Sequence, residues 1–213
     1  VEQNTELLET VKHNWNILGR KANLINENLE DFLQKNSQKF DLTYLDPARR
    51  DAQKNKKFLL EDLSPNLLEI QEKLGEISDE IIIKLSPLID ISYLLSVVKN
   101  VSKIEIIAVK NEVKELLVFS SGKNSYPETQ IKCVNLESTD PDFVFIFNDE
   151  KNAVAEYSDP QNFLYLPNNA VLKSGAFNTV AKKFKLLKLH ANTHFYTSDE
   201  LVKEFSGRLL AVV

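Results

Sequence analysis

The chain is poor in the residues that mark several protein classes. Its 213 residues include one cysteine, five glycines, one tryptophan and no methionine. A single cysteine, Cys133, excludes an internal disulfide and a cysteine-rich zinc site, and it is typical of a reducing compartment. No apolar run approaches the roughly 18 residues of a membrane-spanning helix, and the first residues do not have the pattern of a signal peptide. We therefore predict a cytoplasmic protein without membrane contact.

The lack of methionine extends to the first position, where the chain begins Val-Glu-Gln-Asn. Such a start is typical of the interior of a protein, so we expect these residues to be a segment of a longer chain. The net charge of −5 argues against a general nucleic-acid coat but leaves room for local basic surfaces. Two basic patches, 49–57 and 182–188, are either solvated faces or phosphate-binding tracks.

Short apolar runs alternate with helical patterns over the first 120 residues. Strands are predicted at 1–2, 23–26, 40–45, 80–85, 103–109 and 113–119, and the run 80–85 is expected to be fully buried. Helices are predicted at 5–18, 29–33, 64–75 and 88–98, the third with Ser64 as its cap and Gly75 as its end. This alternation predicts a parallel sheet covered by helices on both faces. The last two strands are joined by a few residues, so they must run antiparallel.

The pattern changes after residue 120. A polar linker leads to strands predicted at 130–136 and 143–147. From 158 onward we predict a small α+β unit, with strands at 163–166, 186–189, 195–197 and 208–213 and helices at 170–184 and 198–205. We therefore divide the chain into a main domain at 1–120, connecting strands at 121–157 and a small domain at 158–213.

The stretch 40–51 carries the strongest sign of a functional site. Its apolar strand stops at Asp46-Pro47, and Arg49 and Arg50 follow. Pro47 has no N–H for a strand ladder and keeps Asp46 extended. Ligands bind beyond the carboxyl ends of strands in open α/β sheets. A plain turn with two solvated arginines fits the same residues.

Six stretches together resemble the motifs of a known family, and the likeness runs the whole length of the chain. They are 1–4, 40–51, 84–90, 109–117, 165–177 and 189–198. The chain resembles bacterial class I methyltransferases that depend on S-adenosylmethionine (SAM) and carry a THUMP-like module. The resemblance implies a Rossmann-like sheet, parallel with an antiparallel final strand, followed by a small ferredoxin-like α+β domain. It also implies SAM as cofactor and a base in rRNA or tRNA as target.

The resemblance assigns roles to particular residues. Glu2 would accept hydrogen bonds from the ribose hydroxyls of SAM, Asn28 would bind the adenine, and Asp46 would also belong to the cofactor site. Asp46, Pro47 and Arg49 would form the loop held against the target base, where Asp46 orients the attacking atom or accepts its proton. The substrate-side residues would be Arg49, Arg50, Lys84, Ser86, Asn111 and Glu112.

Three functions stay open at this point. The first is an RNA methyltransferase, and the second is a methyltransferase of a small molecule or protein on the same scaffold, which the acidic composition favours. The third is a non-catalytic RNA- or protein-binding module. The family's glycine-rich first motif would precede residue 1, so we expect weak or no SAM binding by these residues alone. His190 and His194 are predicted to lie in a turn and not in a metal site, and Cys133 has no histidine partner to activate it.

Overall fold

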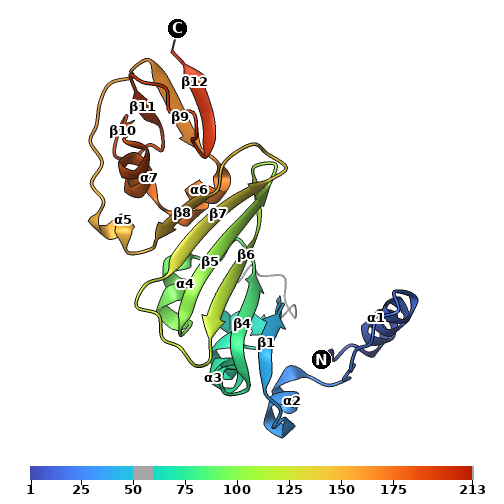
Figure 1. The fold of residues 1–213 in the computed structure, drawn as a ribbon. Helices are drawn as coiled ribbons and strands as arrows, with labels where there is room; N and C mark the ends of the chain where they lie inside the picture. The colour runs from blue at the N-terminus through green and yellow to red at the C-terminus, as the bar shows by residue number, and fades with distance from the viewer. Residues whose placement is uncertain (50–59, 213) are drawn as a thin grey trace.

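A six-stranded sheet forms the centre of the molecule (Figure 1). The computed structural model describes residues 1–49 and 60–212. The strands lie in the order β1 (Phe40–Leu45), β4 (Ser78–Leu85), β6 (Glu112–Ser121), β5 (Val101–Val109), β7 (Gln130–Leu136) and β8 (Phe143–Ile146). Strands β1, β4, β5 and β7 share one direction, whereas β6 and β8 run against them. The predicted sheet, mostly parallel with an antiparallel last strand of the main domain, is therefore confirmed.

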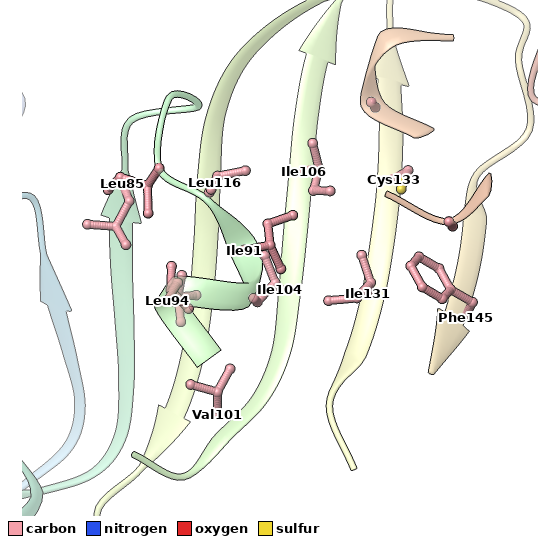
Figure 2. Close-up of a cluster of buried hydrophobic side chains, with 14 of the residues drawn as sticks. Leu85, Ile91, Leu94, Val101, Ile104, Ile106, Leu116, Ile131, Cys133 and Phe145 are labelled. Atoms are coloured by element: carbon pink, nitrogen blue, oxygen red, sulfur yellow. The ribbon is translucent and has the colours of Figure 1, made fainter. Parts of the chain in front are cut away.

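Helices pack on one face of this sheet. Helices α3 (Leu67–Ile77), α4 (Ile91–Val97) and α6 (Asn169–Ser174) contribute to the same buried cluster as the strands. Figure 2 shows Ile91 and Leu94 of α4 over Ile104 and Leu116 of the sheet. Burial alternates along β4, with Ile83 buried and Ile82 partly exposed, so the prediction of a fully buried strand between two helical layers is wrong. A strand buried on one face needs apolar residues only at every second position, and the Ile run hid this alternation.

The start of α3 differs from the prediction. Asn66 caps the helix by accepting a hydrogen bond from the Leu68 amide at 3.1 Å. Ser64 instead ends β3 (Leu63–Ser64), which pairs with β2 (Ala48–Arg49) and follows a 3-10 turn at Leu60–Asp62. Gly75 lies inside α3 and does not end it. It packs against Gly122, whose Cα would be 3.3 Å from a Cβ at Gly75.

The N-terminal segment holds two capped helices and no strand. Asn4 caps α1 (Thr5–Ile17), and Asn28 caps α2 (Leu29–Lys35). The strands predicted at 1–2 and 23–26 are wrong: they meet through one backbone hydrogen bond, from Glu2 N to Ile25 O at 3.0 Å. One bond is too little for a ladder, since a strand is stabilised by a neighbour along its length.

The small domain has its own antiparallel sheet, in the order β10 (Leu187–Lys188), β11 (Tyr196–Ser198), β9 (Phe163–Pro167) and β12 (Gly207–Ala211). The helix predicted at 170–184 is two helices, α6 and α7 (Phe177–Phe184), because Gly175 takes a left-handed φ of 75° between them. The helix predicted at 198–205 is wrong. Ser198 belongs to β11, and its hydroxyl bonds Tyr165 and Glu200 instead of capping a helix.

A chain of amide and carboxylate side chains joins the small domain to the main sheet. Asp140, which follows β7, accepts hydrogen bonds from the side-chain amides of Asn135 and Asn168, both at 2.9 Å. Asn111, in the turn between β5 and β6, accepts from both the backbone and the side chain of Asn169, at 2.7 and 2.6 Å. Helix α6 is thereby fixed over the end of the sheet. The short helix α5 (Asp149–Asn152) follows β8 in the chain and precedes β9 of the small domain.

Cys133 is expected to resist thiol reagents in the folded protein. Its side chain is 2% exposed, and burial raises the pKa of the thiol to about 12, so the reactive thiolate is scarce at pH 8. Labelling with Ellman's reagent should be negligible in native buffer and complete in 6 M guanidinium chloride. Ser37→Cys, which adds a thiol at an exposed position, is the matched control and should react at once. Fast native labelling of Cys133 would contradict the burial.

Candidate functional site

The parallel pairing of β1 and β4 brings Asp46 and Lys84 together. Leu45 pairs with Ile83, so the next residue of each strand lies at the same height on the solvent side of the sheet. Lys84 Nζ lies 2.5 Å from Asp46 Oδ2, and the two side chains are 33% and 50% exposed. The hydrogen bond to Asp46 is the main cause that raises the pKa of Lys84. Lys84 is therefore an ammonium at neutral pH, and it anchors one oxygen of the carboxylate.

A cleft of about 250 Å³ surrounds this ion pair. Its walls come from the ends of β1 and β4, the start of β6 and the small β2–β3 flap, and its lining residues are Asp46, Pro47, Leu63, Lys84, Leu85, Ser86, Pro87, Lys114 and Glu115. This volume lies below the range of pockets that enclose a whole drug-sized ligand, roughly 300–1,000 Å³. The cleft therefore suits one flat or compact group of a ligand, held among two carboxylates and two ammonium groups.

Four of the predicted site residues meet in this cleft: Asp46, Pro47, Lys84 and Ser86. Arg49 belongs by its backbone to β2 and pairs with Leu63, which lines the cleft, and Arg50 lies outside the described residues. The prediction that a carboxylate stands at the carboxyl end of a strand beside the ends of its neighbours agrees with this geometry.

The other predicted residues do not line the cleft. Glu2 accepts a hydrogen bond from the Asn4 amide at 2.7 Å, and the Asn28 side chain caps α2. Asn111 bonds Asn169 of α6, and Glu112 forms an ion pair with Lys114 at 2.7 Å. These side chains make local or interdomain contacts in this structure.

Two charged residues of the cleft were missed from sequence. Lys114 and Glu115 stand at the start of β6, next to the end of β4 because the two strands are antiparallel. The tight turn at 110–111 was the available signal, since it places the start of β6 at the same sheet edge as the end of β5. Leu63 comes from the flap, and its pairing with Arg49 has no local signature in the sequence.

The two histidines, His190 and His194, make different contacts. His190 Nδ1 accepts a hydrogen bond from the Asn192 amide at 3.1 Å, whereas the His194 ring stacks on Phe177 with centroids 3.9 Å apart. Within residues 1–49 and 60–212, no group of three or more His, Cys, Asp or Glu residues is arranged to hold a metal ion. Across the same ranges, no helix has both the length and the apolarity to cross a membrane.

Comparisons with known proteins agree with this architecture. Residues 163–205 match the family model of a ferredoxin-like domain, which confirms that prediction for the small domain. The chain is similar, at 31% identity and a TM-score of 0.87, to the crystal structure of a "putative methyltransferase" from Porphyromonas gingivalis W83. The match covers 100% of this chain and 54% of that one, so the chain spans about half the length of that protein. No protein of curated function matches the sequence.

Proposed function

We propose that the protein is a SAM-dependent methyltransferase that modifies a base in rRNA or tRNA, and that Asp46 acts on the target base. The observation that carries the proposal is the charged cleft at the carboxyl edge of β1 and β4, within a chain that resembles a "putative methyltransferase" over its full length. The resemblance implied an antiparallel final strand in the main domain, and β6 is antiparallel to both of its neighbours, β4 and β5. Fold alone does not fix the substrate, so the side chains of the cleft must account for the chemistry.

Asp46 is the residue best placed to handle a proton. Its Oδ2 is bound by Lys84, and within the described part of the chain Oδ1 makes no hydrogen bond or ion pair. Oδ1 would accept a hydrogen bond from the attacking atom of the base and take its proton as the new bond to carbon forms. Pro47 keeps the loop backbone extended, and Lys84 holds the carboxylate in one orientation. Lys114, at the start of the neighbouring β6 and paired with Glu112, would offer a second cation toward a phosphate of the substrate.

The residues fit the two ends of the cofactor differently. SAM, when bound, supplies an electrophilic methyl group on a sulfonium sulfur. The cleft at Asp46 suits the reacting end of a complex with substrate, but Glu2 and Asn28 bond their own neighbours and are not turned toward that cleft. The residues expected to bind the ribose and adenine are therefore not assembled at this cleft.

A methyltransferase of a small molecule or protein is the second candidate function. The net charge of −5 and the sequence pI near 5.4 favour a target without a phosphate backbone, because an acidic protein repels nucleic acid at long range. The cleft itself is mixed in charge, with Lys84 and Lys114 against Asp46 and Glu115.

The fate of a labelled methyl group distinguishes these functions. The natural full-length gene product is incubated with methyl-tritiated SAM and, separately, with total RNA, cell protein and small-molecule extract from the native host. We expect RNase-sensitive, protease-resistant label in the RNA sample alone. Label in protein or in small molecules would overturn the RNA proposal, and no transfer to any of the three would overturn the enzymatic one.

Weak or no SAM binding is expected for the 213-residue chain by itself. Isothermal titration calorimetry with SAM should give no saturable heat at millimolar concentration, whereas the full-length gene product should bind. The reason is that Glu2 and Asn28 are engaged in local hydrogen bonds and the cleft holds only part of a ligand. Micromolar binding by the 213-residue chain would show that it contains a complete cofactor site.

A further inference from the structure

Lys173, in the last turn of α6, reaches from the small domain to the main domain. Its Nζ donates a hydrogen bond to the carbonyl oxygen of Ile89 at 2.9 Å. The side chain is half-buried, and this burial is the main cause that lowers the pKa of Lys173, while the charge of Asp90 acts in the opposite direction. Burying an ammonium is unfavourable unless it gains a specific contact, and here the contact is one backbone carbonyl of a loop.

That loop, residues 86–90, contributes one wall of the candidate cleft. Its first two residues, Ser86 and Pro87, line the cleft. The loop is folded on itself, since the amides of Leu88 and Ile89 donate to the side-chain and backbone oxygens of Ser86, at 3.3 and 3.2 Å. These bonds use amide groups and leave the Ile89 carbonyl for Lys173. The Lys173 ammonium therefore holds the turn from the side of α6, through its hydrogen bond to the Ile89 carbonyl.

Helix α6 is itself fixed, so it can act as a support. Its first residue, Asn169, makes two hydrogen bonds to Asn111, and its cap residue Asn168 bonds Asp140. Its buried side chains Ala170 and Val171 pack within the core of the main sheet. Lys173 extends from this anchored helix, whereas loop 86–90 connects β4 to α4 and has the cleft on one side.

We propose that Lys173 is a positioning residue that sets the cleft wall formed by Ser86 and Pro87. The small domain would thus shape the substrate side of a cleft whose charged pair comes from the main sheet. This inference rests on the proposed function for its effect on catalysis, but the contact between Lys173 and the loop can be tested without any activity.

The test compares Lys173→Met, which keeps the aliphatic stem and removes the ammonium, with the wild type in the full-length gene product. Hydrogen exchange followed by mass spectrometry should show the peptide around 86–90 exchanging about tenfold faster or more, as expected for loss of a hydrogen bond from a charged donor. The peptide of α6 should be unchanged. With methyl-tritiated SAM and total RNA, KM for RNA should rise by a similar factor while kcat and KM for SAM stay the same.

The matched control is Lys183→Met. Lys183 of α7 also donates to a backbone carbonyl, that of Val144 in β8, but it is outside the cleft. This variant should leave both the exchange of the loop and KM for RNA unchanged. Lys173→Arg, which retains a donor, should restore most of the wild-type behaviour, and Lys173→Gln replaces Lys173→Met if the latter does not fold.

Three results would overturn the inference. These are wild-type loop exchange in Lys173→Met, faster exchange spread equally over all peptides, and an effect of Lys183→Met as large as that of Lys173→Met. If the wild-type protein transfers no methyl group to any substrate while Lys173→Met still frees the loop, the proposed function has failed and the positioning contact has not. The two failures are therefore distinguishable.

Discussion

Replacing Asp46 by Asn is expected to lower kcat/KM for methyl transfer by roughly 100- to 10,000-fold, the range for loss of a positioned proton acceptor. Asn keeps the shape of the side chain but cannot take a proton, and it exchanges a charged partner of Lys84 for a neutral one. The thermal midpoint should change little, because both side chains are partly exposed and surface ion pairs stabilise by about 1 kcal/mol at most.

The measurement is incorporation of tritiated methyl groups by the full-length gene product at saturating SAM. Asp41→Asn is the matched control, because Asp41 lies on β1, the strand that Asp46 follows, is exposed and is outside the cleft. It should retain wild-type activity. An Asp46→Asn variant within threefold of the wild type would show that Asp46 takes no part in the reaction.

Replacing Gly122 by Ala is expected to give a large loss of stability. A Cβ at this position would lie 2.1 Å from the Gly75 carbonyl oxygen and 2.3 Å from that of Ser78, both of them backbone atoms that cannot rotate away. Relief requires α3 and the end of β6 to move apart, and such overpacking costs about 3 kcal/mol. For a chain of this size the thermal midpoint should fall by roughly 6–12 °C.

Circular dichroism of thermal unfolding measures this loss. Lys123→Ala, at the next position and exposed, is the control and should shift the midpoint by no more than about 2 °C. An unchanged midpoint for Gly122→Ala would mean that Gly122 lies farther from the Gly75 and Ser78 carbonyl oxygens than these distances indicate.

Strands with a clear apolar run and a clear stop could be predicted from the sequence. Strand β1 begins at Phe40 and ends at Leu45, as predicted, because Asp46-Pro47 ends the ladder. The antiparallel pairing of β5 and β6 was predicted from the few residues that join them. The break within 170–184 and the turn after Ser198 were missed because Gly175 and Ser198 each fit two local structures, and distant partners decide between them.

Part of the candidate cleft could be predicted because its residues lie at the ends of strands. Asp46, Lys84 and Ser86 stand at the ends of neighbouring strands, and strand order alone brings them together. Asn28 was assigned to the cofactor, but the structure uses it as a helix cap, and asparagine suits both tasks equally well. Lys173 had no local signal, because its partner Ile89 is 84 positions away in the chain.

The contacts of α6 with the loops of the main domain also bear on how the chain is made. The Asn111 side chain and the Ile89 carbonyl bond residues 169 and 173, which lie 58 and 84 positions further along the chain. During synthesis on the ribosome, the strands of the main sheet emerge well before these partners. The edge of the sheet that carries Asp46 is therefore among the last parts of the molecule to reach its final form, and a nascent chain that stops short of α6 would present an unfinished cleft.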